Sequence, residues 1–274
     1  MYHAAEIATV RYSRSPELTH NTIPTTRAQP SGGFTMTEPL DLREDEQIEL
    51  AHRLGPKWHE FKKSWCRYTW PNDWYQMSDG AVYYSMLTTL RPKRILEVGS
   101  GFTSAIALDV RDQELHDLEL TFIDPNPQRL LGLLKDHDHA ATTIYRKPVQ
   151  EVPIEAFDVL EKDDILFIDS SHISWSGSDV NFLFLDVLPR LKEGVVVHVH
   201  DIFYPFEYPD VWRVLPGFAW NELYFVRAFL SYNSTFQITF FNSWLWREHP
   251  EIVGRYFPES VNLRASSLWL RRVA

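Results

Sequence analysis

Arg94-Ile-Leu-Glu-Val-Gly-Ser-Gly-Phe-Thr-Ser104 is the stretch of this 274-residue chain that decides its fold. It reads as a strand that enters a tight turn and continues into a helix. Gly99 and Gly101 mark the turn, because glycine accepts positive φ angles and lets a ligand approach the backbone closely. The stretch therefore predicts a strand, a turn and a helix arranged around a bound ligand.

Strand and helix patterns alternate regularly after this stretch. They predict strands at about 94–99, 119–124, 141–145, 164–169 and 194–200, and helices near 102–112, 126–136, 150–160 and 178–191. Beyond Pro209 they predict a helix at 220–230, a strand at 236–241, a helix at 250–256 and a last strand at 267–271. Such alternation implies a parallel sheet covered on both faces, with right-handed crossovers. We expect an α/β fold with a doubly wound, mostly parallel, seven-stranded sheet.

The N-terminal third divides into two parts of different character. Residues 1–40 carry prolines and scattered Ser and Thr but no apolar signal segment, so we expect a mobile leader, with translation starting at Met1 or at Met36. Residues 41–92 show helical patterns at about 44–67 and 78–90. We interpret them as an N-terminal helical and lid region in front of a ligand-binding domain at 93–274.

Composition excludes several classes of function. The net charge of -10, from 27 Lys and Arg against 37 Asp and Glu, argues against a nucleic-acid partner, since phosphate backbones require clustered cations. No run approaches the roughly 18 apolar residues of a membrane span. The single Cys66 excludes an internal disulfide and a multi-thiolate zinc site. We expect a cytoplasmic protein without a membrane partner, and a homo-oligomer is left open.

Two acids flank the glycine turn at positions that suit an adenosine compound. Asp124 ends the second predicted strand, where a carboxylate can accept both hydroxyls of a ribose. A dinucleotide-binding motif requires a third glycine three residues after Gly101, where this chain has Ser104. Glu97 is unfavourable beside a pyrophosphate but suits a cationic amino-acid group. A nicotinamide-dependent oxidoreductase is therefore the less favoured alternative.

These features resemble the class I S-adenosylmethionine-dependent methyltransferases over roughly residues 78–274. The resemblance implies a Rossmann-like methyltransferase fold, with residues 93–274 as the cofactor-binding domain. It implies that the cofactor S-adenosylmethionine, with product S-adenosylhomocysteine, contacts Glu97, Gly99, Ser100, Gly101, Ser104, Asp124 and Asp169. The chain departs from the fullest motif at Thr103, where a third glycine often stands.

Two further strand ends carry groups that can bind a metal or move a proton. They are Ile165-Leu-Phe-Ile-Asp-Ser-Ser-His172 and Val195-Val-Val-His-Val-His-Asp201. Ligands of open α/β sheets lie beyond the carboxyl ends of the strands, so Asp169, His172, His200 and Asp201 should converge there. His198 lies deeper in its strand, and we interpret it as a core residue with satisfied hydrogen bonds.

This second group resembles the metal site of the catechol-type and macrolide-sugar O-methyltransferases. The resemblance implies a divalent metal, Mg²⁺ or Mn²⁺, held by Asp169, His200 and Asp201, with His172 as general base. The family usually has an acid at the place of His200. Imidazole shifts metal preference from Mg²⁺ toward Mn²⁺, Fe²⁺, Co²⁺ or Zn²⁺, and a site without metal is the alternative.

The acceptor is expected to be a small molecule. The aromatic segment 202–212 follows the site, and with segment 68–75 it is the expected lid over the sulfonium. By resemblance a hydroxyl of a sugar or glycoside is the leading acceptor, and a catechol or phenol is its rival. A non-catalytic adenosyl-binding protein remains a further alternative.

Overall fold

The computed structural model describes residues 40–62 and 65–274. The expected leader, apart from Leu40, and the alternative start at Met36 lie outside the described residues. The expected helix at 44–67 is observed from Glu44 to Phe61, as α2.

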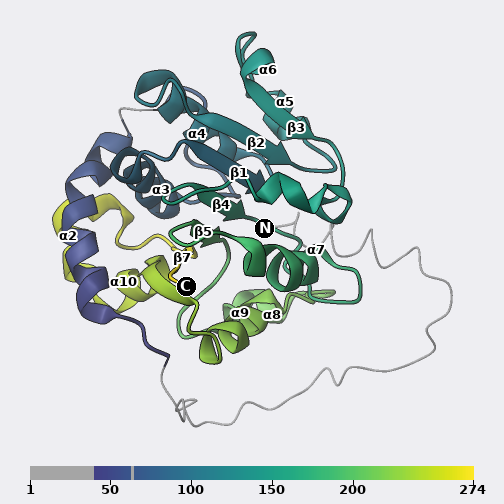
Figure 1. The fold of residues 1–274 in the computed structure, drawn as a ribbon. Coiled ribbons are helices and arrows are strands. Elements are labelled where there is room, and N and C mark those ends of the chain that lie inside the picture. Colours follow the sequence, from purple (N-terminus) through teal and green to yellow (C-terminus); the bar gives the residue numbers. More distant parts are fainter. Residues whose placement is uncertain (1–39, 63–64) are drawn as a thin grey trace.

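The centre of the molecule is one seven-stranded sheet in the order β3-β2-β1-β4-β5-β7-β6 (Figure 1). Its strands are β1 Arg94–Val98, β2 Glu119–Ile123, β3 Thr142–Tyr145, β4 Ile165–Ile168, β5 Val196–Val199, β6 Phe236–Phe241 and β7 Leu268–Arg272. The first five strands are parallel, whereas β7 runs antiparallel between β5 and β6. The predicted mostly parallel, seven-stranded α/β fold is confirmed.

Helices lie on both sides of this sheet (Figure 1). The helices, besides α2, are α3 Met77–Leu90, α4 Phe102–Gln113, α5 Gln128–Leu131, α6 Asp138–Ala141, α7 Asp179–Asn181, α8 Asp210–Arg213, α9 Glu222–Ser231, α10 Asn242–Glu248 and α11 Pro250–Tyr256. Single turns of 3-10 helix are η1 Val149–Glu151, η2 Ile154–Phe157, η4 Leu188–Arg190 and η5 Pro258–Ser260, and η3 Phe182–Val187 is a π-helix. Contacts link α2 to α3, α3 to α4 and α4 to α5 as one layer.

Two of the predicted helices are wrong in kind or length. At 150–160 the chain forms only the short turns η1 and η2, because Pro153 lacks the N–H that a continuous helix needs. At 126–136 only the four residues of α5 are helical. The helix α10 was not predicted. The predicted helix at 178–191 exists, but it passes from α through π to 3-10 geometry before ending beyond Pro189.

The second N-terminal helix is packed all round rather than on one face. Every residue of α3 from Met77 to Thr88 is buried, since α2 and α4 contact it and its tyrosines reach the sheet. The ring of Tyr83 lies 4.9 Å from that of Phe167 on β4 and 5.9 Å from that of Trp269 on β7. The helix thereby forms part of the floor beneath the ends of β4 and β5.

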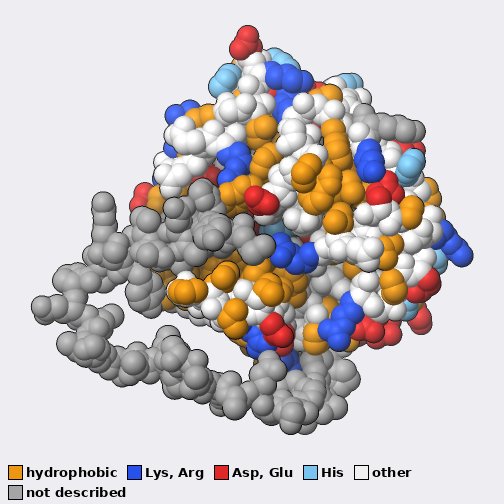
Figure 2. Space-filling model, turned by 180° about the vertical axis from the view of Figure 1, so that it is seen from behind, with side chains coloured by type: hydrophobic (Ala, Val, Ile, Leu, Met, Phe, Trp, Pro, Cys, Tyr) orange, Lys and Arg blue, Asp and Glu red, His pale blue; other side chains and the backbone are white. Residues whose placement is uncertain are grey.

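Charged side chains of both signs are mixed on one face of the molecule. On the face drawn in Figure 2, Lys and Arg side chains are scattered among acidic, uncharged and apolar ones. Among the described residues, no helix combines the length and the apolar character that crossing a membrane requires.

Candidate cofactor and metal site

The glycine turn brings three strand ends into close contact. The Gly99 N–H donates to the carbonyl of Ile123 at 2.9 Å, and the Asp169 N–H donates to the carbonyl of Val98 at 2.8 Å. Gly99 has φ +81°, and a Cβ atom placed on it would lie 2.1 Å from the carbonyl oxygen of Asp169. No side chain larger than hydrogen fits there, so the turn requires its glycine.

A buried carboxyl group lies directly beneath this turn. Glu97 is 0% exposed, and its Oε1 accepts hydrogen bonds from the hydroxyls of Thr103 and Ser104. Its Oε2 has no partner among the described residues. Burial raises the pKa of Glu97 to about 8, although both hydroxyl donors act in the opposite direction. Sequence reasoning treated Thr103 only as a departure from a motif and missed this contact.

The acid that ends β2 is tied to the same turn. Asp124 Oδ2 accepts from the backbone N–H of Ser100 at 3.0 Å and from its hydroxyl at 2.7 Å. Its Oδ1 accepts from the Asn126 N–H at 2.7 Å. Asp124 is therefore fixed in orientation beside the glycines.

An arginine that sequence reasoning missed covers the turn. The Arg129 guanidinium stacks 3.8 Å from the ring centre of Trp74 and 5.6 Å from that of Phe102. A Cβ atom placed on Gly101 would lie 3.0 Å from Arg129 Cδ. Burial lowers the pKa of Arg129, against the charges of Asp169 and Asp124. A cation from α5 thus faces the predicted cofactor residues.

The four predicted residues at the ends of β4 and β5 converge. His172 Nε2 lies 3.4 Å from Asp169 Oδ1 and 3.6 Å from Asp201 Oδ2. His200 Nδ1 lies 3.5 Å from Asp169 Oδ1 and 3.6 Å from Asp201 Oδ2. Two carboxylate oxygens and two imidazole nitrogens therefore alternate around a closed ring. The two histidines hold the pKa of Asp169 well below its usual range, against the opposing effect of burial.

The outer nitrogen of His172 is held by a carboxylate from α9. His172 Nδ1 lies 2.8 Å from Glu222 Oε2, and Glu222 also accepts from the Ser170 hydroxyl at 2.9 Å. Burial alone would lower the pKa of His172, but hydrogen bonds to Asp169 and Glu222 raise it well above its ordinary value. Glu222 was not predicted, because it is 50 residues away in the chain.

His200 is held from its other side by a serine. Its Nε2 lies 3.2 Å from Ser266 Oγ, while its Nδ1 has no hydrogen-bond partner among the described residues. Burial lowers the pKa of His200, but Asp201 and Asp169 outweigh burial and raise it to about 9. The Nδ1 nitrogen of His200 is therefore buried between the carboxylates of Asp169 and Asp201.

The backbone at two of these residues is left-handed. His172 has φ 60° and Asp201 has φ 57°, a region that residues other than glycine adopt uncommonly. His172 follows the end of β4 and Asp201 follows the end of β5, so the backbone turns sharply at each of these residues. Such strain is typical of functional positions.

The interpretation of His198 as a satisfied core residue is wrong in one respect. It is 0% exposed, and its ring stacks 3.8 Å from that of Phe167. Neither ring nitrogen has a hydrogen bond among the described residues. Burial lowers its pKa well below the ordinary value, so His198 is neutral.

Aromatic side chains of the segment after β5 border the ring of four residues. Trp220 lies 4.2 Å from the ring of His172, and Trp212 lies 5.4 Å from Trp220. The Tyr208 hydroxyl accepts from the Leu223 N–H at 3.1 Å, which fastens the segment to α9. Glu207 accepts from the Tyr224 hydroxyl at 2.9 Å.

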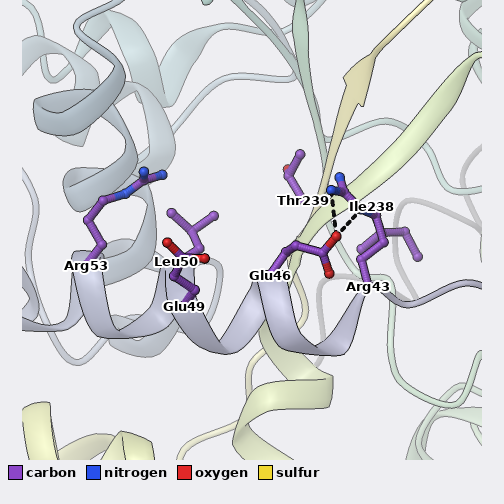
Figure 3. Close-up of a pocket in the computed structure, with 7 residues that line it drawn as sticks. All are labelled: Arg43, Glu46, Glu49, Leu50, Arg53, Ile238 and Thr239. Atoms are coloured by element: carbon purple, nitrogen blue, oxygen red, sulfur yellow. Dashed lines mark hydrogen bonds and ion pairs between the residues drawn. The ribbon is translucent and has the colours of Figure 1, made fainter.

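Among the described residues, a second cluster has ligand atoms that all lie within 4.8 Å of one another, and a pocket lies elsewhere on the molecule. Asp112, His137 and Asp138 also lie close together, but both carboxylates are paired with Arg67, and Asp138 also with Arg111. The pocket in Figure 3, of about 210 Å³, lies between α2 and β6 and is lined by Arg43, Glu46, Glu49, Leu50, Arg53, Ile238 and Thr239. No predicted site residue lines it.

One family model matches the middle of the chain. Residues 96–202 match the family model of a methyltransferase domain. An uncharacterized protein of Archaeoglobus fulgidus is 31% identical over 137 residues, which cover 46% of this chain and 60% of that protein. The chain thus spans less than two thirds of that relative's length.

Several solved structures are similar to this chain at low sequence identity. The S-adenosylhomocysteine-bound Podospora anserina methyltransferase PaMTH1 is 13% identical, with a TM-score of 0.47 over 88% of this chain and 100% of its own. The O-methyltransferase TomG of Streptomyces achromogenes, in complex with S-adenosylmethionine, is 12% identical, with a TM-score of 0.44 over 86% and 100%. A putative caffeoyl-CoA O-methyltransferase of Staphylococcus aureus is 14% identical, with a TM-score of 0.47 over 85% and 100%. Residue roles therefore rest on the geometry of this chain.

Proposed function

We propose that the protein is a class I S-adenosylmethionine-dependent methyltransferase, because residues 96–202 match the family model of a methyltransferase domain, and that it methylates a hydroxyl of a small molecule with the help of a divalent metal. The observation that carries this proposal is the closed ring of Asp169, His172, His200 and Asp201 beside the glycine turn. A methyl donor and a group that activates an oxygen would meet at one edge of the sheet.

The cofactor residues of the proposal surround the glycine turn. Asp124 would accept the ribose hydroxyls, and the backbone of Gly99 to Gly101 would let the amino-acid moiety approach closely. The unpaired Oε2 of Glu97 is a buried acceptor that suits its ammonium group. Ser104 supports Glu97, and Asp169 would contact both the cofactor and the metal.

The donor set fits a divalent cation. The ring offers two carboxylates and the His200 Nδ1 nitrogen, which is buried without a hydrogen bond. Oxygen ligands suit Mg²⁺, whereas imidazole favours Mn²⁺ and softer metals, so we propose Mn²⁺ ahead of Mg²⁺. When bound, the metal would lower the pKa of an acceptor hydroxyl and fix its position.

His172 is the proposed general base. Its Nε2 would take the proton of the acceptor hydroxyl as the oxygen attacks the methyl carbon and the carbon–sulfur bond breaks, releasing S-adenosylhomocysteine. Glu222 would hold the proton on Nδ1 and stabilise the imidazolium that forms. Asp169, Glu222 and Asp201 together raise the pKa of His172. A divalent cation held by Asp169 and Asp201 would offset two of these three carboxylates and so lower the pKa of the proposed base.

The acceptor is proposed from the aromatic border of the site. Trp220 and Trp212 offer flat faces next to His172, which suit a sugar ring, so a sugar or glycoside hydroxyl is our first candidate and a catechol or phenol the second. Segments 68–75 and 202–212 are the proposed lid, with residues 41–92 as a helical region in front of the domain at 93–274. We also propose a cytoplasmic location. The protein would act there as a monomer or as a homo-oligomer.

Release of S-adenosylhomocysteine from glycoside and catechol acceptors tests this function. We expect EDTA to suppress turnover, and His172→Ala to lower it by about 10²–10⁴-fold, the usual contribution of a general base. His116→Ala removes an exposed histidine and is the matched control. Turnover that neither EDTA nor His172→Ala affects would remove the mechanism. Calorimetric binding of NADH without binding of S-adenosylhomocysteine would favour an oxidoreductase instead.

A further inference from the structure

We propose that Asp79 and Ser266 are positioning residues that orient His200 so that its Nδ1 lone pair faces Asp169 and Asp201 and binds the metal. The proposal rests on the proposed function and concerns the one ligand at which this chain departs from the resembled family. Ser266 Oγ lies 3.2 Å from His200 Nε2 and 3.3 Å from Asp79 Oδ2. Asp79 and Ser266 are both at least 99% buried.

The direction of these hydrogen bonds follows from the donors available. Asp79 accepts from the Asn242 side-chain N–H at 2.7 Å and from the backbone N–H groups of Ser266 and Ser267 at 3.0 Å each. A carboxylate surrounded by N–H donors acts as an acceptor only. The single hydroxyl proton of Ser266 therefore points to Asp79, and its oxygen accepts from a proton on His200 Nε2. The other nitrogen, Nδ1, is then the one free to bind a cation.

Ser266 is fixed by its backbone on both sides. Its N–H donates to Asp79 on α3. Its carbonyl accepts at 2.8 Å from the N–H of Ile202, the residue after Asp201. The backbone of Ser266 is thus anchored both to α3 and to the segment that carries the proposed metal ligand Asp201. A serine held in this way is suited to keep an imidazole ring in one orientation.

The other histidine of the ring is held by a similar arrangement. Glu222 contacts the outer nitrogen of His172 directly, as Asp79 contacts that of His200 through a hydroxyl. Outer carboxylates that fix the tautomer of a metal-binding histidine typically strengthen metal binding by about 10–100-fold. The serine relay would therefore favour metals that bind imidazole, with Mn²⁺ preferred over Mg²⁺.

Calorimetric titration of the metal-free full-length protein with Mn²⁺ and with Mg²⁺ tests the relay. We expect Ser266→Ala to weaken Mn²⁺ binding by about 10–100-fold, to weaken Mg²⁺ binding less, and to leave the affinity for S-adenosylhomocysteine unchanged. Ser260→Ala is the matched control, because its hydroxyl is equally buried but donates to the Phe257 carbonyl, outside the relay. Ser266→Thr keeps the hydroxyl and should restore Mn²⁺ binding. Equal Mn²⁺ affinities of Ser266→Ala and Ser260→Ala would overturn the proposal.

A second measurement needs no change at Ser266. Pulsed electron paramagnetic resonance of Mn²⁺ bound to the wild type should detect a coupled imidazole nitrogen, which His200→Ala removes and His172→Ala retains. A signal that survives His200→Ala, or no nitrogen signal at all, would contradict the assignment of His200 as a ligand. Intact binding of S-adenosylhomocysteine in that case would leave the methyltransferase proposal standing. Wild-type protein that does not bind S-adenosylhomocysteine would instead remove the proposed function.

Discussion

Replacing Gly99 by alanine tests whether the glycine turn is shaped by close approach of the strand ends. The added Cβ atom would lie 2.1 Å from the carbonyl oxygen of Asp169, at a residue with φ +81°. The left-handed backbone alone costs an alanine about 1–2 kcal/mol, and overpacking adds about 1–3 kcal/mol. We expect Gly99→Ala to lower the free energy of unfolding by about 2–5 kcal/mol.

Gly177 provides a matched control for this substitution. It has φ +78°, and a Cβ atom placed on it would meet nothing within 4 Å. Gly177→Ala should therefore cost only the backbone part, about 1–2 kcal/mol. The difference between the two variants isolates the contact of the turn with Asp169.

Urea unfolding of both variants measures the two costs, and calorimetry with S-adenosylhomocysteine measures the effect on binding. Because the backbone around Gly99 must shift to relieve the contact, we expect Gly99→Ala to abolish detectable binding and Gly177→Ala to leave it intact. If Gly99→Ala costs no more stability than Gly177→Ala and still binds S-adenosylhomocysteine, the close-approach argument is refuted.

Three further predictions concern carboxyl groups. Asp124→Ala should weaken S-adenosylhomocysteine binding by roughly 10–100-fold, since it removes a charged acceptor worth about 1.5–3 kcal/mol, while the exposed Asp117→Ala should not; equal affinities by calorimetry would count against the ribose contact. Burial raises the pKa of Glu97 from 4.5 to about 8, so the folded protein keeps a proton that the unfolded chain releases, and the free energy of unfolding should fall as the pH rises through this range. Urea unfolding at several pH values should show a shallower fall for Glu97→Gln than for the wild type. The same pH dependence in both proteins would disprove the assignment. Glu222→Gln should lower turnover by about 10²-fold or more in the adenosylhomocysteine release assay, because a Gln amide can donate to His172 Nδ1 and place the proton on the wrong nitrogen; unchanged turnover would rule out this role.

The parts of the fold that sequence predicted well depend on local periodicity. All seven strands lie within two residues of their predicted bounds, because buried parallel strands are short apolar runs bounded by turns. Convergence of Asp169 and His172 with His200 and Asp201 could be predicted for the same reason, since the carboxyl ends of parallel strands share one edge.

What the sequence could not predict lies in contacts between distant elements. Glu222 and Ser266 hold the two histidines, but Glu222 lies in α9 and Ser266 in the segment before β7, and neither carries a motif. Their hydrogen bonds join residues 50 and 66 positions apart. The unsatisfied nitrogens of His198 were equally invisible, because hydrogen-bond satisfaction depends on the packing of neighbouring elements.

The left-handed backbone at His172 and Asp201 has a consequence for evolution and engineering. Glycine at either position would relieve about 1–2 kcal/mol of backbone strain while deleting the proposed base or a proposed metal ligand. At His172 the same substitution would leave the buried Glu222 carboxylate without its partner, which typically costs about 3–5 kcal/mol. The interactions of the reactive side chains thus offset the strain of the backbone that presents them, so that loss of either side chain would be expected to lower both stability and activity.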